Sequence, residues 1–333
     1  MRIEHNFDLS SLNTFRMKVR CACYVEYDSV DELTALDWDS LPRPLKHIGA
    51  GSNLLFTGDF PGTVLHSAIR YIKYVDLGLD EVPVMVGAGT TWDEVVENTC
   101  RNGIWGAENL SLIPGETGAA AVQNIGAYGV EFKDIVSGVV CFDLIEKRKC
   151  KFTTAECRYG YRESMFKEAD GRYIVTSVLL RLSRKPRPRL EYKGLEGIDA
   201  SSPASVREAV IKIRRTKLPD PAEKGSAGSF FKNPVVSALE FARIIDAAGG
   251  ETVPHYILDG GFIKVPAAWL IDRCGFKGER EGGAAVYEKQ PLVIVNDSGD
   301  ASPADILELE RRIVAGVRER FGVSLQPEVE HII

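Results

Sequence analysis

The sequence lacks the short signatures that would assign it at once to a common class of protein. No apolar run approaches the roughly 18 residues that a membrane helix requires, so we expect no membrane partner. The N-terminal MRIEHNFDLS has no apolar signal-peptide core, which favours a cytoplasmic protein. Seven cysteines lie scattered from Cys21 to Cys274 without any C-x-x-C, which is typical of reduced thiols and predicts neither a disulfide framework nor a metal site.

Excess positive charge and the familiar nucleotide-binding fingerprints are also missing. The formal net charge is −6, so we expect no nucleic-acid partner. The one basic stretch, RLSRKPRPR at residues 181–189, is short and holds two prolines; we interpret it as a solvated connector, with a binding patch as the alternative. There is no G-x-G-x-x-G between a strand and a helix and no G-x-x-x-x-G-K-[ST], so neither a Rossmann nor a Walker site follows.

Short apolar strands dominate the first half of the chain, and helices dominate the second. A length of 333 residues favours two or three domains. Strands and helices mix without a strict βαβ rhythm, so the sequence predicts an α+β fold, with a boundary near residues 185–202. Predicted strands cover residues 45–48, 63–65, 82–86, 139–144, 291–295 and 329–333, and predicted helices follow Thr91, Ser202, Ser237 and Ser302 or span residues 266–274.

Three glycine-rich segments stand out in the first half. They read IGAGSNLLF at residues 48–56, VGAGTT at 86–91 and SLIPGETGAAAVQNIGAYG at 111–129. Clustered glycines let a backbone approach a ligand closely and expose N–H donors, which suits a pyrophosphate. Each segment alone is equally consistent with a plain turn, but together they favour a cofactor with a long phosphate-bearing tail.

A serine surrounded by small residues lies in AGSFFKNP, residues 227–234. Ser229 is not part of a G-x-S-x-G elbow, because Phe230 and Phe231 stand where the second glycine should follow. None of the five histidines forms a recognisable hydrolase pattern, so nothing supports a Ser–His nucleophile. On local sequence alone, Ser229 either satisfies a turn or carries another chemistry.

Seven segments spread over nearly the whole chain resemble the UDP-N-acetylenolpyruvoylglucosamine reductase family, flavoenzymes of bacterial peptidoglycan precursor synthesis. Each is weak evidence alone, but seven in the family's order are very specific. Tyr192, in LEYKGL, stands where the first subtype of the family carries a tyrosine on an extra loop, which implies that subtype. The seven segments are NTFRM (13–17), GAGSNLLF (49–56), SLIPGETGAAAVQNIGAYGVE (111–131), YGYRESMFK (159–167), RRTKLPDP (214–221), AGSFFKNP (227–234) and PEVEHI (327–332).

The resemblance implies an FAD-binding fold of the vanillyl-alcohol-oxidase (PCMH) type and a C-terminal α+β substrate domain. The implied division is an FAD-binding subdomain at residues 1–66, joined by a last strand at 326–333, a second FAD-binding subdomain at 67–201, and a UDP-sugar-binding domain at 202–325.

The implied activity is that of a UDP-N-acetylmuramate dehydrogenase. NADPH would reduce FAD, and the flavin would then pass a hydride to UDP-N-acetylglucosamine enolpyruvate. Arg162 would stabilise the resulting enolate, because its planar guanidinium matches a carboxylate and keeps its proton. Glu328 would be protonated or hydrogen-bonded, since a free carboxylate would repel the enolate, and Ser229 would donate the final proton as general acid. Without the resemblance, Arg162 would be interpreted as a surface salt-bridge residue and Glu328 as a rim carboxylate.

The resemblance also implies ligands for the substrate and the cofactor. Lysines suit a UDP diphosphate as compact charges, whereas FAD would be held mainly by backbone amides. The implied substrate-binding residues are Tyr161, Tyr192, Lys217, Asn233, Lys277 and Gln290. The implied FAD-binding residues are Ala50, Gly51, Ser52, Asn53, Leu54, Ser111, Ile113, Pro114, Gly115, Gly118, Ala119, Gln123, Asn124, Gly126, Ala127 and Tyr128.

The sequence departs from the family pattern at two places. Glu116 stands where a small or apolar residue is usual, which bears on how tightly the flavin pyrophosphate is held, and Glu330 and His331 follow the terminal Pro-Glu-Val. We expect a monomer, and a monovalent cation that activates relatives is one further cofactor to consider.

Two alternative functions remain. The first is an oxidase of the same fold, which would lack the segments at 159–167, 227–234 and 327–332, and the second is a non-catalytic UDP-sugar and flavin-binding regulator.

Overall fold

The computed structural model describes residues 1–75, 78–169 and 171–333, and the chain divides into two compact units. Unit 1 comprises residues 1–7, 20–50 and 60–215, and unit 2 comprises residues 8–19, 51–59 and 216–333. Residues 185–202 lie inside unit 1, and the chain leaves that unit for the last time at Thr216. The division into three domains, with its bounds at residues 66, 201 and 325, remains a prediction.

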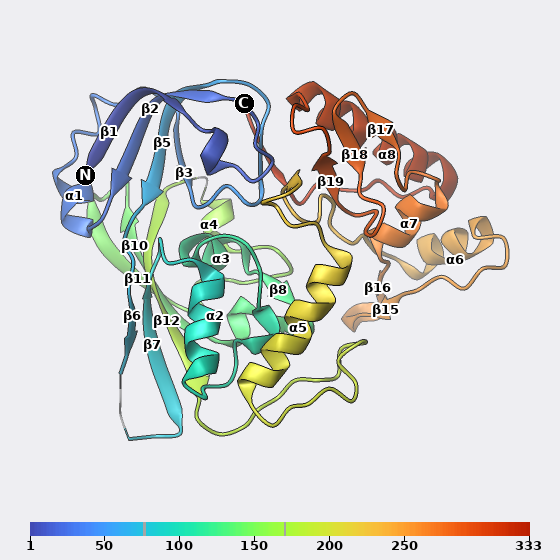
Figure 1. Cartoon of the computed structure of the whole chain (residues 1–333), viewed down its shortest axis with the longest axis horizontal. Helices are drawn as coiled ribbons and strands as arrows, with labels where there is room; N and C mark the ends of the chain where they lie inside the picture. Colours follow the sequence, from blue (N-terminus) through green and yellow to red (C-terminus); the bar gives the residue numbers. More distant parts are fainter. Residues whose placement is uncertain (76–77, 170) are drawn as a thin grey trace. The chain divides into compact units, whose positions relative to one another are not determined.

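Unit 1 is built on two sheets (Figure 1). The first has the strand order β1-β2-β5-β3, and β5 pairs in parallel with both β2 and β3. The second has the order β11-β10-β12-β7-β6, and its neighbouring strands are antiparallel. The strands of the two sheets are β1 (Arg2–Asp8), β2 (Arg20–Tyr27), β3 (Leu45–Ile48), β5 (Phe60–Ser67), β6 (Ile72–Tyr74), β7 (Glu81–Gly87), β10 (Val136–Asp143), β11 (Arg148–Thr153) and β12 (Tyr173–Ser183). A separate antiparallel pair is formed by β8 (Gly126–Ala127) and β9 (Val130–Glu131).

Helices of unit 1 cover the second sheet and close its hydrophobic core. Trp92 and Phe132 are both completely buried there, with their rings edge to face at a centroid distance of 5.5 Å. The helix predicted after Thr91 is confirmed, and its apolar side chains are buried. Thr91 makes no side-chain capping bond, and the helix start is fixed by Trp92 N donating to Gly115 O at 2.9 Å. The helices are α1 (Val30–Ala35), α2 (Trp92–Arg101), α3 (Thr117–Gln123), α4 (Met165–Glu168) and α5 (Pro203–Lys217).

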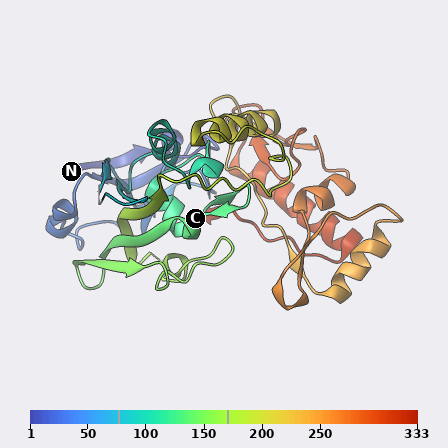
Figure 2. The ribbon, with the colours of Figure 1, turned by 90° about the horizontal axis from the view of Figure 1, so that it is seen from below.

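Unit 2 contains two small antiparallel sheets and one parallel strand pair. The sheets have the orders β13-β19-β18-β17 and β14-β16-β15, and β20 pairs in parallel with β4. Three helices accompany them, and the longest, α8, packs against β17 and β18 (Figure 1, Figure 2). The elements are β4 (Leu54–Phe56), β13 (Gly225–Ser226), β14 (Val235–Val236), α6 (Ala238–Ala247), β15 (Tyr256–Ile257), β16 (Ile263–Lys264), α7 (Ala267–Arg273), β17 (Arg280–Glu281), β18 (Ala284–Val286), β19 (Ile294–Asn296), α8 (Pro303–Phe321) and β20 (Glu330–Ile332).

The helix starts of unit 2 follow from local sequence. Ser237 and Ser302 each accept a hydrogen bond from the backbone N–H three residues on, and the acidic side chain there accepts one from the backbone N–H of the serine, so a capping box starts each helix. The strand predicted at 291–295 is shorter than expected: residues 291–292 form a turn, and β19 begins at Ile294. The mixture of parallel pairs, antiparallel sheets and helices confirms the α+β class. Among the described residues, no helix is both long and apolar enough to cross a membrane.

Candidate active site

In unit 1, the first and third glycine-rich segments lie against each other. A Cβ on Gly49, the neighbour of Ala50, would lie 3.2 Å from the Cβ of Ala119 in α3. Gly118 N donates to Ala88 O at 2.9 Å, and a Cβ on Gly118 would lie 2.9 Å from the Cβ of Ala88. Small residues at these positions therefore let three stretches of main chain approach one another, as a phosphate-binding site requires.

The turn that leads into α3 contains four of the predicted FAD ligands. Ser111 is completely buried and its Oγ donates to Glu108 O at 2.6 Å, so this side chain stabilises the turn. Ile113 is half-buried, Pro114 is exposed, and Gly115 has a left-handed φ of 118° that favours glycine. The turn therefore presents backbone and apolar surface, in keeping with the expectation that main chain matters more than side chains here.

Asn124, which ends α3, organises the loops on either side of it. Its side chain is completely buried, and Nδ2 donates to Glu131 Oε2 at 2.9 Å and to Gly160 O at 2.8 Å. Its Oδ1 accepts from Lys133 N at 2.9 Å. A left-handed φ of 46° is tolerated better by asparagine than by most residues. The Asn124 side chain is thus fully engaged within the protein and positions other groups.

Arg162 is one of the groups that this arrangement positions. It sits in a tight turn closed by two backbone bonds between Gly160 and Glu163, and its own φ of 59° is left-handed. Its Nη2 donates to Gly126 O at 2.8 Å, and its guanidinium lies 5.3 Å from the ring centre of Tyr161. A strained backbone at a charged residue is a feature of functional sites. Arg162 therefore lies against the predicted FAD segment, with Tyr161 beside it.

Aromatic residues continue this region of unit 1. The rings of Tyr128 and Tyr192 meet edge to face at 5.4 Å, and Tyr192 is 40% exposed. Burial raises the pKa of the Tyr128 phenol, and the nearby Arg214 opposes that shift. Of the remaining predicted ligands, Gln123 and Ala127 are half-buried at the end of α3 and in β8.

Sequence reasoning missed two residues of this region. Asn109 is buried, and its Nδ2 donates to Tyr128 O and to Arg189 O, both at 2.8 Å, which ties the Tyr128 backbone to the segment before Tyr192. Burial lowers the pKa of Arg214, and its Nε has no hydrogen-bond partner among the described residues. The signal for Arg214 was present, because it is the first residue of RRTKLPDP.

In unit 2, the loop after Gly51 is fixed by the NTFRM segment. Gly51 has a φ of 64°, and a Cβ there would lie 2.1 Å from Leu12 O, so only glycine fits. Its carbonyl accepts from Thr14 N at 3.2 Å. Buried Asn13 donates to the carbonyls of Leu9 and Met17, which holds the supporting turn closed. Ser52 is half-buried, and Leu54 opens β4 beneath this loop.

Backbone pairing brings the segments of Ser229 and Glu328 together. Phe230 O accepts from Glu328 N at 2.8 Å, and Phe230 N donates to Leu292 O at the same distance. Asn53 joins them, because its Nδ2 donates to Glu328 O and its carbonyl accepts from Glu330 N, both at 3.0 Å. Ser229 and Glu328 are each half-buried. Two predicted catalytic residues and one predicted FAD ligand therefore share one small region of unit 2.

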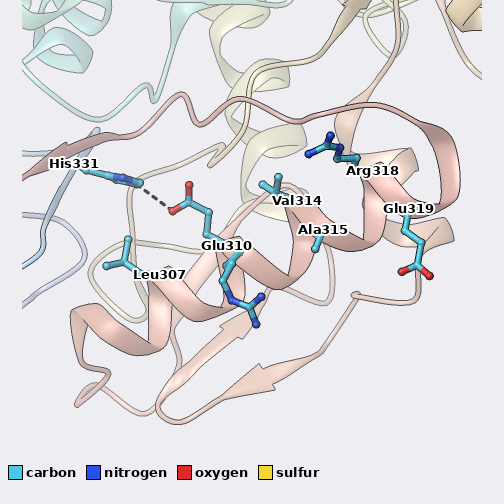
Figure 3. A pocket seen from close by; sticks show the side chains of 8 residues that line it. Leu307, Glu310, Val314, Ala315, Arg318, Glu319 and His331 are labelled. Carbon is cyan, nitrogen blue, oxygen red and sulfur yellow. Dashed lines mark ion pairs between the residues drawn. The ribbon is translucent and has the colours of Figure 1, made fainter.

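The last strand is also held from the side of α8. His331, one of the departures from the family pattern, points toward Glu310, with Nε2 and Oε2 3.2 Å apart (Figure 3). The same face of α8 contributes Leu307, Val314 and Ala315 to a hollow of about 820 Å³. This contact holds β20 at His331, which lies three residues after Glu328 in the sequence.

The other predicted substrate ligands of unit 2 come from loops and helix ends. Asn233 Oδ1 accepts from Ala267 N at 2.9 Å, so its carbonyl caps α7. Lys217 and Lys277 are exposed, the first at the end of α5 and the second after α7. Gln290 is half-buried in the turn between β18 and β19. The exposed lysines are accessible to an anionic ligand, whereas Asn233 has a structural role at its oxygen.

Positions where only glycine or alanine fits coincide with the segments predicted to bind a diphosphate, so the residues present fit a dinucleotide cofactor. Comparison with known proteins gives the class first: residues 22–144 match the FAD binding domain model, and residues 220–332 match the C-terminal domain model of UDP-N-acetylenolpyruvoylglucosamine reductase. The chain is a flavoprotein with an FAD-binding domain followed by a reductase-type C-terminal domain.

Whole-chain relatives define the family. The chain is 44% identical to UDP-N-acetylenolpyruvoylglucosamine reductase of Bacteroides fragilis (strain YCH46), covering 99% of this chain and 100% of the relative, and 41% identical to that of Porphyromonas gingivalis (strain W83), covering 100% of both. The crystal structure of the Thermus caldophilus reductase superposes with a TM-score of 0.71 at 27% identity, covering 100% of both chains. The chain belongs to the UDP-N-acetylenolpyruvoylglucosamine reductase family.

Proposed function

We propose that the protein reduces UDP-N-acetylglucosamine enolpyruvate to UDP-N-acetylmuramate in peptidoglycan precursor synthesis, with FAD as cofactor and NADPH as hydride donor. The observation that carries the proposal is family membership over the full chain, together with the presence of Arg162, Ser229 and Glu328. The chemistry that FAD would supply when bound is hydride transfer, from NADPH to the methylene carbon of the enolpyruvyl ether. Its diphosphate would be held by the main chain around Ala50–Leu54 and residues 111–128.

Arg162 would bind the carboxylate of the enolpyruvyl group. Hydride addition leaves negative charge spread over that carboxylate and the adjacent carbon, and a fixed cation can lower the energy of this state by about 3–4 kcal/mol. The guanidinium is already oriented by its bond to Gly126 O, which limits the reorganisation needed in the reaction. The role of Arg162 is therefore positioning of the substrate and stabilisation of charge.

Ser229 would supply the proton that completes the reduction. The substrate carbon is a strong base after hydride addition, so a positioned hydroxyl suffices as the acid. Glu328, whose backbone pairs with the residue next to Ser229, would be protonated or would hydrogen-bond to a neighbouring group in the same region. The backbone ladder through Phe230 supports their joint action, because it limits their relative movement.

The UDP portion would be bound by the substrate ligands that the family resemblance implies. Tyr161 and Tyr192 come from unit 1, and the remaining residues come from the C-terminal part of the chain. Exposed lysines would pair with the diphosphate, and Tyr192 would cover the substrate. A monomeric state and activation by a monovalent cation are further expectations. The UDP ligands proposed from unit 2 are Lys217, Asn233, Lys277 and Gln290.

The test is to follow the two half-reactions separately by flavin absorbance without oxygen. NADPH should bleach the flavin band, and UDP-N-acetylglucosamine enolpyruvate should restore it. In Ser229→Ala, NADPH should still bleach the flavin band at the native rate. The return of the band after substrate is added should be slower by about 10²–10⁴-fold, the typical contribution of a general acid. Ser229→Cys, which keeps an ionisable proton, should recover part of the rate. Near-normal turnover of Ser229→Ala would remove Ser229 as the proton donor, and a protein that binds no FAD would remove the proposed function itself.

A further inference from the structure

A buried charged cluster in unit 1 lies outside the residues assigned so far. His66 in β5 is 4% exposed, and its Nε2 lies 2.9 Å from Oε1 of Glu116, itself 6% exposed. On the other side of the ring, Nδ1 lies 3.3 Å from Glu26 Oε2 and 3.0 Å from the Tyr24 hydroxyl. The Tyr24 hydroxyl donates to the same Glu26 oxygen at 3.0 Å. One imidazole thus bridges two carboxylates that come from different parts of the fold.

These contacts favour the protonated imidazole. Both ring nitrogens face carboxylate oxygens, and only the imidazolium can donate from both nitrogens at once. Burial by itself would lower the pKa of His66, but the hydrogen bonds and charges of Glu116 and Glu26 outweigh it, and the pKa is raised. The His66–Glu116 pair is therefore close to neutral when the imidazole is protonated.

Other groups around His66 keep their charge states through the neutral pH range. Burial, followed by the charge of His66, lowers the pKa of the neighbouring His47 to about 3. Burial raises the pKa of both Tyr24 and Tyr27, so their phenols remain neutral. Arg2 stays positive, with its guanidinium 5.8 Å from the ring centre of Tyr24. His66 is consequently the group in this cluster whose charge changes near neutral pH.

Glu116 connects the cluster to the first and third glycine-rich segments. It immediately precedes α3, where its carbonyl accepts the first helical bond, from Ala120 N at 2.9 Å. Its other oxygen, Oε2, would lie 3.3 Å from a Cβ on Gly49, the residue before Ala50. Its side chain therefore reaches from the start of α3 to the main chain of the first segment. An unpaired carboxylate at this place would repel a bound diphosphate.

We propose that His66 and Glu116 are a positioning pair for FAD, in which protonated His66 neutralises Glu116 beneath the diphosphate-binding segments and couples FAD binding to proton binding. The inference rests on the proposed function, because it assumes that these segments hold the diphosphate. His66 and Glu116 need not touch FAD. They hold the two segments together and remove a negative charge that the cofactor would otherwise meet.

The direction in which stability and FAD affinity change with pH follows from the coupling of proton binding to folding. Because the folded protein raises the pKa of His66 above its unfolded value, protonation of His66 stabilises the fold at low pH. That stabilisation is lost as the pH rises through the raised pKa. The same loss of charge exposes FAD to the carboxylate of Glu116, so FAD affinity falls in the same direction.

The experiment is a titration of the full-length apoprotein with FAD, followed by quenching of flavin fluorescence between pH 6 and 8.5. For the native sequence, the FAD dissociation constant should rise by about tenfold over this range, a typical coupling between two sites. Glu116→Gln removes the charge but keeps the shape and should abolish most of this rise. His66→Gln leaves Glu116 uncompensated and should weaken FAD binding by about tenfold already at pH 6.5.

Two further variants separate an electrostatic role from simple packing. The double variant His66→Gln, Glu116→Gln should bind FAD more tightly than His66→Gln alone, because it removes the unpaired charge. Glu26→Gln removes the carboxylate that faces His66 Nδ1, on the side of the ring opposite Glu116. It should move the midpoint of the pH dependence lower while retaining the rise itself. The thermal unfolding midpoint of each apoprotein reports how much of any effect is structural.

Outcomes that overturn the proposal differ from those that overturn the proposed function. FAD binding that is independent of pH in the native sequence would overturn the coupling. So would equal losses in Glu116→Gln, His66→Gln and the double variant, because equal losses indicate packing alone. If the native apoprotein bound no FAD at any pH, the flavin-dependent function would fail instead.

Discussion

The two units hold their candidate residues by different means. In unit 1, buried polar side chains do so: Asn124 bonds to residues 131, 133 and 160, Arg162 bonds to Gly126 O, and His66 joins Glu116. In unit 2, backbone pairing joins the segments of the candidate residues, since Phe230 pairs with Glu328 and Asn53 with Glu330, and the Asn53 side chain adds one bond to Glu328 O. The comparison indicates that the candidate residues of the two units should be sensitive to different kinds of substitution. Unit 1 should be sensitive to the loss of polar atoms, and unit 2 to any change in backbone path.

The largest effect is expected from Gly51→Ala in unit 2. An added Cβ would overlap Leu12 O at 2.1 Å, and the residue has a φ of 64°. Strain and displacement together should cost at least about 3 kcal/mol of unfolding free energy and reduce FAD content. Gly58→Ala is the matched control in the same loop region, because its Cβ would meet nothing within 4 Å. Urea unfolding and the flavin-to-protein absorbance ratio measure both, and equal stability of the two variants would contradict the backbone account of unit 2.

The next effect is expected from Asn124→Ala in unit 1. The change leaves Lys133 N without its acceptor and removes two hydrogen bonds from a buried site, so about 2–3 kcal/mol of stability should be lost. Hydrogen exchange should accelerate at the Lys133 amide and in residues 160–163, where Arg162 lies. Asn102→Ala provides the control, because that side chain is exposed at the end of α2 and donates to Asn98 O of the same helix at 2.8 Å. Unchanged exchange in Asn124→Ala would show that the loops are held by other contacts.

The smallest effect is expected from His331→Ala. Its contact with Glu310 is one of the side-chain contacts of β20, beside the bond from Thr57 Oγ1 to Ile332 O, and β20 is already paired with β4 along its whole length. A partly exposed ion pair contributes at most about 1 kcal/mol, so unfolding free energy should fall by no more than this. A loss of 3 kcal/mol or more, measured by urea unfolding, would mean that unit 2 also depends on side chains.

Elements with local signals were predictable from the sequence. The capping boxes at Ser237 and Ser302 fixed the starts of α6 and α8, because both partners of each box lie within three residues. The start of β19 was predicted three residues too early, because the apolar run after Pro291 has strand composition but begins inside a turn. Periodicity and composition do not record where a turn ends.

The candidate site was predictable as a set of residues but not as a structure. Family motifs give Ser229 and Glu328, yet nothing in either motif indicates that their backbones pair through Phe230. Glu116 is recognisable as unusual, but its partner His66 lies 50 residues away in sequence and carries no motif. Long-range partners arise from the tertiary fold, and a single sequence contains no local signal for them.

The pairing of β4 with β20 has a consequence for protein synthesis. Asn53 and Glu328 are separated by 275 positions, so the loop after Gly51 has no partner strand until the chain has been made to Ile332. At about 5–20 residues per second, this interval lasts on the order of 15–55 seconds. Throughout that time the apolar β4 segment has been synthesised but its partner β20 has not. The loop after Gly51, which is predicted to bind the cofactor, therefore gains its partner strand only after translation of the β20 segment, and a chain terminated before residue 330 would lack that strand.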